Sequence, residues 1–485
     1  MTSPPVPTSR ILEIGCADGS NVIAMGYALP NAQCVGIDFS VRQIEQGQAL
    51  LAHLDLPNVT LKHKDILEIT PSFGEFDYII AHGVYSWVPE AVQEKLLEIC
   101  RQNLAPNGVA YISYNTRPGW NMRGVIRDML LYHAQPSEKP AASLEQLKAF
   151  WELLRDFVTE QKSLYGAFLH RELEMLKELP ESYLFHEFLE EHNQPIYFHE
   201  FVKRAKQHGL KYLGDTEVET MFTENVSTQL ANKLQDLSWV DKEQYLDFFT
   251  NRLFRQSLLC HHNVTLQRHI TLEVIKQFYL ASPLEPPENL EIFSNQPQKF
   301  SKNGRGSLEE KRPLVKSALT YLYNCWPQTI KFSELLQQAA LQLSVPADRL
   351  TAVLENSLAK ALLKAYLGGQ IEAFIYPPRC STSSAYPKVS DLARMQIQQG
   401  KTAVSNLRCE QLQLHPLLGK IVPFIDGQRD EVSLMTIVHD LTKRGIIDAH
   451  REDQFVAYEA VTPDMLHHFV QKTLAYLART ALLVA

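Results

Sequence analysis

The sequence predicts an α/β protein with a mostly parallel sheet in its N-terminal half and mainly helical domains after it. Short apolar strands alternate with helices from Ile11 to about His262, a pattern typical of strand–helix–strand units. A glycine-containing turn joins the first strand to the first helix, as in doubly wound sheets. Past Asn263 this alternation stops and helical periodicity dominates.

Size and charge bound the class of protein. The 485 residues should form about two to four domains, and 45% hydrophobic with 21% charged residues is ordinary for a globular chain. A net charge of −8 argues against a general nucleic-acid binder. We expect these domains: 1–130, the ligand-binding core; 131–190, a helical insertion; 191–265, the remainder of the sheet; 266–380, a mainly helical middle domain; and 381–485, a mainly helical C-terminal domain.

The cysteines and the apolar runs indicate the compartment. The seven cysteines form no C-x-x-C pair, so we expect neither a metal site nor a disulfide framework but buried thiols in a reducing cytoplasm. Residues 1–10 hold three prolines and no apolar core, which argues against a signal peptide. No apolar run is long enough to span a membrane.

The segment from Arg10 to Asn21 carries the strongest signal for a ligand. Apolar residues up to Ile14 form a strand, Gly15 to Gly19 form a tight turn, and a helix begins at Ser20. Asp38 ends the second strand about 20 residues past the turn, where a carboxylate can bind ribose hydroxyls. The E-x-G-x-x-D-G spacing lacks the third glycine that a pyrophosphate requires, which favours an adenosine ligand without phosphates. As the alternative, such glycine turns occur in any α/β protein.

Polar and aromatic residues follow the later strands. Asp65 comes after the third strand, where it either faces the adenine edge of a ligand or caps a turn. The fourth strand, 76–81, opens into a loop that contains His82, Tyr85 and Trp87. Ligands of open sheets bind at the carboxyl ends of strands, so this loop is a candidate reaction site. The open alternative is that Tyr85 and Trp87 pack beneath the following helix.

The rest of the chain predicts mostly helices. Residues 123–189 form a helical insertion that covers the strand tips, and helices with strands near 210–214 and 254–260 complete the sheet. The proline-rich stretch 283–313 is expected to be a mobile loop or linker. Helices followed by a strand at 371–376 favour a winged-helix-like unit. Residues 392–485 are again helical in character, and their basic residues are too scattered for a helix that reads DNA.

Several segments together resemble one family. The chain is similar to class I S-adenosylmethionine (SAM) methyltransferases that carry a methyltransferase regulatory domain, among them the rickettsial-type protein lysine methyltransferases. The segments that carry the resemblance are Leu12–Cys16, Gly36–Asp38, Asp77–Pro89, Ser113–Thr116, Leu184–Glu187, Phe198–Phe201, Asn406–Arg408 and Phe424–Gly427. The resemblance implies a Rossmann-like class I methyltransferase domain with a helical insertion, followed by mainly α, winged-helix-like C-terminal domains.

The resemblance also implies a cofactor, an acceptor and site residues. We expect SAM as the cofactor, a protein lysine as the acceptor, and no nucleic-acid partner; the sequence names neither the acceptor protein nor an oligomeric state. The expected cofactor-binding residues are Glu13, Gly15, Cys16, Ala17, Asp18, Gly19, Asn21, Asp38, Phe39, Asp65, Ile66 and His82. The expected catalytic residues are His82, Tyr85, Trp87 and Tyr114, with Trp120 a further candidate for an aromatic wall beside the cations.

The sequence leaves two alternative functions open and supports two further expectations. The chain is alternatively a small-molecule methyltransferase, or a catalytically weak regulatory protein that keeps the fold. Family members carry some tens of residues before the glycine turn and only ten precede Ile11 here, so we expect a partly solvated cofactor and weak SAM binding. The region after Asn263 is expected to select the acceptor and to contribute little to cofactor binding.

Overall fold

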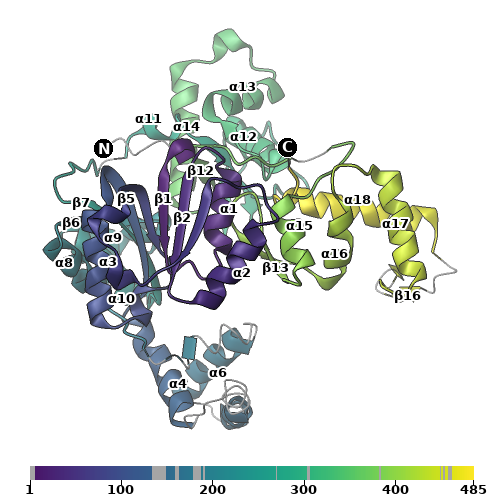
Figure 1. The fold of residues 1–485 in the computed structure, drawn as a ribbon. Coiled ribbons are helices and arrows are strands. Elements are labelled where there is room, and N and C mark those ends of the chain that lie inside the picture. Colours follow the sequence, from purple (N-terminus) through teal and green to yellow (C-terminus); the bar gives the residue numbers. More distant parts are fainter. Residues whose placement is uncertain are drawn as a thin grey trace. The chain divides into compact units, whose positions relative to one another are not determined.

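In the computed structural model the chain forms two compact units. Unit 1 comprises residues 1–65, 76–78 and 265–485, and unit 2 comprises residues 66–75 and 79–264 (Figure 1). The structure describes residues 6–133, 149–158, 163–177, 187–188, 190, 192–268, 270–302, 306–381, 384–447, 449–451, 454–456 and 461–484. Short 3-10 helices lie at η1 Val6–Thr8, η2 Ile66–Glu68, η3 Pro71–Phe73, η4 Tyr85–Trp87, η5 Val218–Met221, η6 Thr223–Asn225, η7 Ala347–Arg349 and η8 Val422–Phe424.

A seven-stranded sheet confirms the predicted α/β fold. Its order is β3-β2-β1-β4-β5-β7-β6. The strands are β1 Arg10–Ile14, β2 Gln33–Asp38, β3 Val59–His63, β4 Phe76–Ala81, β5 Leu104–Asn115, β6 Leu210–Asp215 and β7 Phe254–His261. β1 pairs with β2 and β2 with β3 in parallel, whereas β7 is antiparallel to both β5 and β6. The sheet is therefore mixed, and the strands near 210 and 254 complete it as the sequence predicts.

In unit 1 two helices pack on the first strands. α1 Ser20–Ala28 follows β1, and α2 Val41–Leu51 follows β2 (Figure 1). The side chain of Ser40 caps α2 by accepting a hydrogen bond from Gln43 N. A Cβ atom on Gly47 would lie 2.3 Å from the carbonyl oxygen of Asp18, so only glycine lets α2 approach the turn after β1 this closely.

In unit 2 helices cover one face of the later strands. These helices are α3 Glu90–Gln102, α8 Phe198–Gln207, α9 Thr228–Leu234 and α10 Trp239–Thr250. The sequence Ala-Pro-Asn-Gly at residues 105–108 predicts a turn, but this prediction is wrong, because β5 already begins at Leu104. The nitrogen Nε2 of His261, at the end of β7, lies 2.9 Å from the carbonyl oxygen of Leu104 and holds this start of the strand.

A buried ionic cluster lies between β7 and α10. The guanidinium of Arg255 is fully buried and contacts Asp247, Glu243 and Asp215 at distances of 2.8, 2.9 and 3.4 Å. It also lies 3.7 Å from the centre of the Phe198 ring. The opposite charges and the ring compensate the loss of water around this guanidinium.

The predicted helical insertion is helical where the structure describes it. It contains α4 Gly119–His133, a helix over 149–158, and α6 Leu164–Lys177. These helices share an apolar cluster, which also includes Phe188. Residues 134–148 and 178–186 lie outside the described residues, and with them most of the Leu184–Glu187 segment. Its predicted position over the strand tips stays a prediction.

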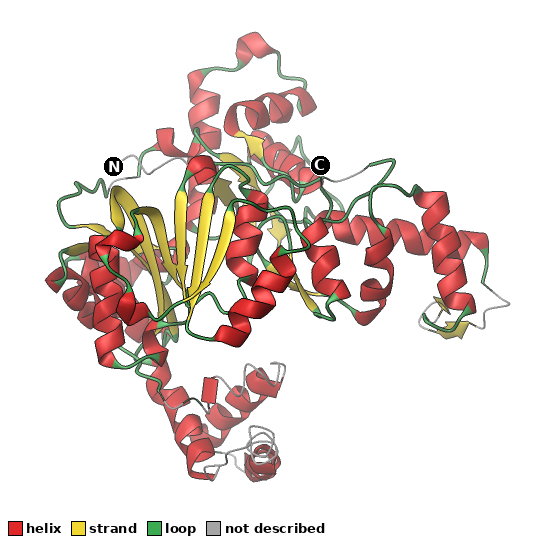
Figure 2. Cartoon of the chain, in the orientation of Figure 1, coloured by secondary structure: helices red, strands yellow, loops and turns green. Residues whose placement is uncertain are grey.

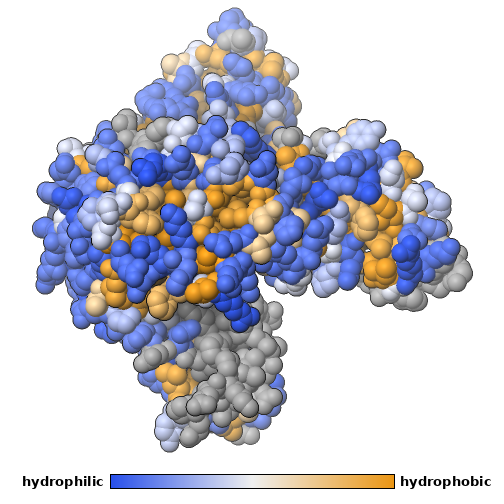
Figure 3. Space-filling model, in the orientation of Figure 1, coloured by the Kyte–Doolittle hydropathy of each residue, from blue (hydrophilic) through white to orange (hydrophobic). Residues whose placement is uncertain are grey.

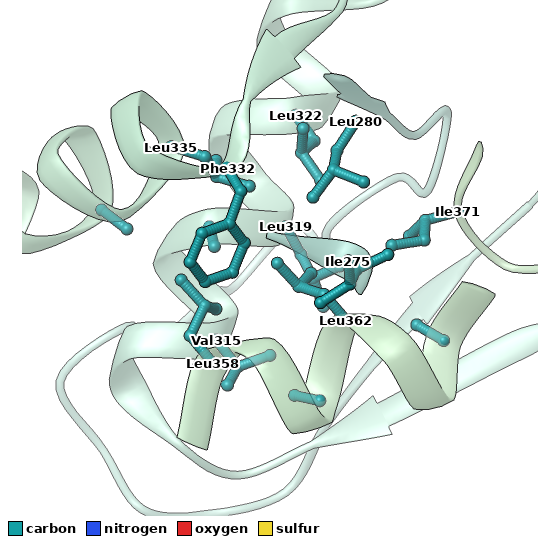
Figure 4. Packing of buried hydrophobic residues seen from close by; sticks show 14 of the residues in the cluster. Ile275, Leu280, Val315, Leu319, Leu322, Phe332, Leu335, Leu358, Leu362 and Ile371 are labelled. Atoms are coloured by element: carbon teal, nitrogen blue, oxygen red, sulfur yellow. The ribbon is translucent and has the colours of Figure 1, made fainter. Parts of the chain in front are cut away.

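The middle part of unit 1 has its own core. It is built from α11 Leu272–Ile275, β8 Tyr279–Ala281, β9 Gln298–Ser301, β10 Ser307–Glu310, α12 Pro313–Cys325, β11 Ile330–Lys331, α13 Phe332–Gln342, α14 Ala352–Leu367 and β12 Glu372–Phe374. Figure 4 shows side chains from α12, α13 and α14 converging, among them Leu319, Phe332 and Leu362. The loop predicted over 283–313 is wrong in part, because β9 and β10 pair as a hairpin and bury Phe300 in this core.

The C-terminal part of unit 1 is mainly helical (Figure 2). Its elements are α15 Asp391–Gln398, β13 Ala403–Ser405, β14 Gln411–Gln413, α16 Pro416–Ile421, α17 Glu431–Lys443, β15 Ala449–Arg451, β16 Gln454–Val456 and α18 Pro463–Arg479. A pocket of about 410 Å³ opens among α16, α17 and α18, where Figure 3 shows hydrophobic residues among hydrophilic ones. No helix in the described part of the chain combines the length and apolarity needed to cross a bilayer.

Candidate active site

The turn after β1 is held in a left-handed backbone conformation. Gly15, Ala17 and Gly19 have φ angles of 71°, 48° and 74°, which glycine adopts freely and alanine rarely. The amides of Gly15 and Cys16 both donate to the carbonyl oxygen of Ile37, at 2.9 and 3.0 Å. These hydrogen bonds attach the turn to the end of β2.

Asp38 braces the same turn. Its carboxylate accepts hydrogen bonds of 2.8 Å from the amide of Ala17 and of 2.8 Å from the amide of Ser40. Each carboxylate oxygen can accept more than one hydrogen bond, so both retain capacity for a ligand hydroxyl. The structure thus brings Asp38 and the glycine turn together, as the sequence predicts.

Glu13 provides a buried acceptor at the turn. Its Oε1 atom accepts from Nδ2 of Asn21 at 2.8 Å, but the buried Oε2 atom has no hydrogen-bond partner among the residues that the structure describes. Glu13 is only 4% exposed, and burial raises the pKa of its carboxyl to about 7. An orphaned buried acceptor beside a glycine turn fits a ligand that carries an N–H donor, such as the amino group of SAM.

The structure gives less support to the predicted cofactor contacts of Phe39, Asp65 and Ile66. Phe39 is 73% exposed, and its ring lies 6.1 Å from that of His63. Asp65 follows β3, whose end is tied to β2 by a 2.9 Å hydrogen bond from Lys64 N to the carbonyl oxygen of Asp38. Ile66 begins the 3-10 helix η2. The proposed contacts of these residues with a cofactor stay predictions.

A lysine from the C-terminal part of the chain reaches the turn. The ammonium of Lys401 lies 2.5 Å from Oδ2 of Asp18 and 3.2 Å from Oγ of Ser20. Although partial burial opposes the effect, the hydrogen bond from Lys401 keeps the pKa of Asp18 below its usual value. Nearby, the amide of Asp391 donates to the hydroxyl of Tyr27 on α1 at 3.2 Å. Residues after Asn263 therefore contact the turn, whereas their expected small contribution to cofactor binding stays a prediction.

In unit 2, His82 belongs to a chain of hydrogen bonds. Its Nδ1 atom lies 2.7 Å from the hydroxyl oxygen of Tyr111, whose O–H donates to Oε1 of Gln256 at 2.8 Å. The Nε2 amide nitrogen of Gln256 donates to Oε1 of Glu217 at 3.2 Å. The His82 ring stacks on Tyr111 and meets the edge of Phe254, and the resulting desolvation lowers the pKa of His82.

Two of the predicted catalytic aromatic residues lie in the core. Tyr85 and Tyr114 are 0% and 1% exposed, and both pack on Phe201 of α8, at 5.3 and 4.2 Å between ring centres. Both residues are therefore packed in the core, and we do not propose them for an acceptor wall. Trp87 is half-buried and meets the buried Trp120 edge to face at 6.3 Å.

Sequence reasoning missed Lys401, Tyr111, Gln256 and Glu217. Tyr111 lies in a predicted strand two residues before Ser113, so the alternation of side chains could have placed both on one face. Gln256 and Lys401 are brought in by strand pairing and domain packing, for which the sequence holds no local signal. Among the described residues, no cluster of His, Cys, Asp or Glu is suited to a metal ion.

The mixed seven-stranded sheet and the turn at the end of β1 define a Rossmann-like, SAM-dependent methyltransferase. Three family models match the chain: a methyltransferase domain over 12–110, a predicted methyltransferase regulatory domain over 180–261, and the C-terminal winged helix domain of PKMT over 385–482. The last match agrees with the predicted winged-helix-like character of the C-terminal part.

The chain also resembles individual proteins over nearly its whole length. It is 33% identical over 468 residues to an uncharacterised protein of Rickettsia prowazekii, covering 94% of this chain and 83% of that protein. The structure of PKMT2 from Rickettsia typhi superposes with a TM-score of 0.88 at 30% identity, covering 100% of this chain and 96% of that one. The same protein in complex with AdoHcy gives a TM-score of 0.88 at 29% identity, with the same coverage of both chains. The chain belongs to this family of methyltransferases with a regulatory domain and a C-terminal winged helix domain.

Proposed function

We propose that this enzyme transfers the methyl group of SAM to lysine side chains of a protein. The observation that carries the proposal is the likeness to Rickettsia typhi PKMT2 over the whole chain rather than over the cofactor domain alone. The C-terminal winged helix domain of PKMT matches residues 385–482, and the sequence resembles the rickettsial-type protein lysine methyltransferases. Bound SAM would supply a methyl group on a sulfonium sulfur, and an amine takes that methyl group by displacing the thioether.

The residues of the turn suit the cofactor. Glu13 offers a carboxylate oxygen without a partner, and Asp38 offers acceptors next to the left-handed turn. Gly36 lets Cys16 of the turn pack closely against β2, because a Cβ atom there would lie 2.8 Å from Sγ of Cys16. We propose that Glu13, Asp38 and the turn from Gly15 to Gly19 hold the cofactor.

The residues at the carboxyl ends of the strands in unit 2 suit a cationic acceptor. A lysine arrives as an ammonium, since its free pKa is about 10.4, and it must lose a proton before it attacks. Glu217 places a carboxylate just past the end of β6, and His82 follows β4. Carboxylates attract the ammonium, and the depressed pKa of His82 keeps its ring neutral and able to accept a proton.

The test combines a labelled cofactor with product analysis. The protein is incubated with SAM carrying a tritiated methyl group and a bacterial cell lysate, which is then separated by size. Acid hydrolysis of the labelled protein should release labelled methyllysines, whereas the Asp38→Ala protein should label poorly.

Each other outcome points to a different function. Label that runs only with small molecules overturns the lysine proposal in favour of a small-molecule methyltransferase. AdoHcy binding by calorimetry with no methyl acceptor in any fraction also contradicts a lysine acceptor. Absence of AdoHcy binding would identify a regulatory protein that keeps the methyltransferase fold.

A further inference from the structure

We propose that His82 is the base that takes the proton from the acceptor, and that Tyr111, Gln256 and Glu217 fix its tautomer. This inference rests on the lysine acceptor proposed above. The observation behind it is a continuous row of four hydrogen-bonded side chains that ends at a carboxylate. All four residues belong to unit 2.

The direction of the row is set at its carboxylate end. A carboxylate only accepts hydrogen bonds, so the amide atom of Gln256 that lies 3.2 Å from Glu217 is the NH₂ nitrogen. The amide oxygen of Gln256 must then face Tyr111, at 2.8 Å. Arg252 lies 3.6 Å from the other oxygen of Glu217; burial raises the pKa of Glu217, and the guanidinium opposes that rise.

The remaining protons follow from this assignment. Tyr111 has one hydroxyl proton, which it gives to the oxygen of Gln256, so its own oxygen can only accept from His82. The 2.7 Å contact with Nδ1 of His82 therefore requires a proton on Nδ1. A neutral imidazole carries one N–H proton, so Nε2 holds a free lone pair.

The Nε2 atom of His82 can be reached by a substrate. The structure gives Nε2 of His82 no hydrogen-bond partner among the described residues, and the side chain is exposed. Tyr111 stacks on the ring at 5.8 Å between centres and Phe254 meets it edge to face at 5.9 Å, so the ring is held in one orientation. His82 directly follows β4, and ligands of such sheets bind at the carboxyl ends of the strands.

The proposed step is a proton transfer followed by displacement. Nε2 of His82 takes one proton from the acceptor ammonium and becomes part of an imidazolium, which Tyr111 stabilises through Nδ1–H. The neutral amine nitrogen forms the new N–C bond to the methyl carbon, while the electron pair of the breaking C–S bond stays with sulfur. His82 later releases its proton to water. Tyr111 and Gln256 are positioning residues, since they act only through His82, whereas Glu217 also attracts the acceptor ammonium as proposed above.

The first test reads the tautomer directly, without an acceptor. The full-length protein is labelled with ¹⁵N-histidine, and the His82 signals are assigned by their loss in His82→Gln. Nitrogen shifts separate protonated from unprotonated imidazole nitrogens, so the wild type should show a protonated Nδ1 and a bare Nε2. Tyr111→Phe and Glu217→Gln should reduce the population of this tautomer, whereas Tyr132→Phe and Glu224→Gln, whose side chains lie outside the row, should not. A bare Nδ1 in the wild type would overturn the assignment.

The second test uses the rate of methyllysine formation on poly-L-lysine. General-base catalysis contributes about 100-fold to 10,000-fold, so His82→Gln should lower kcat at neutral pH by at least about 100-fold. The loss should shrink near pH 10, where the free lysine ionises by itself. Tyr111→Phe should show a smaller loss of kcat with unchanged AdoHcy affinity. A methylating wild type whose pH profile is unchanged in His82→Gln would refute His82 as the base, whereas a wild type without any lysine methylation would contradict the lysine acceptor itself.

Discussion

Replacing Glu13 by glutamine should uncouple cofactor binding from pH. Glu13 is buried with an unpartnered Oε2 atom, and its pKa is about 7, so both protonation states are populated near neutrality. A donor group from the cofactor that faces Oε2 favours the ionised form. AdoHcy binding should therefore displace a proton, and the affinity of the wild type should rise with pH up to about 7, approaching tenfold per pH unit.

The raised pKa of Glu13 also determines how the free energy of unfolding of the ligand-free protein depends on pH. The folded, ligand-free protein holds the Glu13 proton more tightly than the unfolded chain, because burial raises the pKa from 4.5 to about 7. Between these values the folded state binds more protons, so the free energy of unfolding falls as pH rises. At 1.36 kcal/mol per pKa unit the loss amounts to about 3 kcal/mol above pH 7. Without cofactor, Glu13→Gln should escape this loss.

Calorimetry and thermal unfolding test both statements. AdoHcy titrations between about pH 6 and about pH 8, in two buffers with different ionisation enthalpies, count the protons released on binding. Proton release below pH 7 should be present in the wild type and absent in Glu13→Gln. Thermal unfolding without ligand should show the variant to be the more stable protein above pH 7. Identical pH dependence of Kd and Tm in the two proteins would refute the assignment of this titration to Glu13.

Three further outcomes are expected. Asp38→Ala should weaken AdoHcy binding by about 1.5–3 kcal/mol through loss of hydrogen bonds to a charged acceptor, while Asp55→Ala, on an exposed loop, should not; equal affinities by calorimetry would exclude Asp38 from the site. Trp87→Ala should depress turnover more than AdoHcy binding; a loss of about 3–5 kcal/mol in stability with normal kinetics would instead assign Trp87 to the core. Lys401→Met should weaken AdoHcy binding by about 1 kcal/mol at low salt and by less at high salt, since its contact with Asp18 is partly exposed. An unchanged Kd at low salt would show that this contact does not support the turn.

Local patterns predicted the first part of the fold well. β4 spans the predicted residues, and β1, β2 and β3 end within one residue of their predicted ends, because apolar runs between turns determine buried strands. The same reasoning failed at residues 105–108, where pairing with other strands extends β5 across a Pro–Asn–Gly sequence. The short hairpins past residue 290 also escaped, since strands of three or four residues carry too few side chains for a periodic signal.

The residues of the candidate site were also predictable only in part. Asp38 and the glycine turn are linked by neighbouring parallel strands, so sequence spacing was enough to join them. Tyr85 and Tyr114 could not be separated from surface aromatics, because nothing in their neighbourhood indicates which face α8 covers. Lys401 lies 383 positions from Asp18, and only the packing of the C-terminal part brings the two together.

The ionic cluster around Arg255 constrains how this protein can diverge. Removing one member of a buried ion pair typically costs about 3–5 kcal/mol, a large share of the stability of an ordinary domain. Replacing Arg255, Asp247 or Glu243 alone therefore passes through a poorly folded intermediate, although an apolar set replacing all of them could pack well. We therefore expect related chains either to keep all three charged residues or to replace all three by apolar ones. Covariation at the three positions would then mark lineage within the family independently of the cofactor turn.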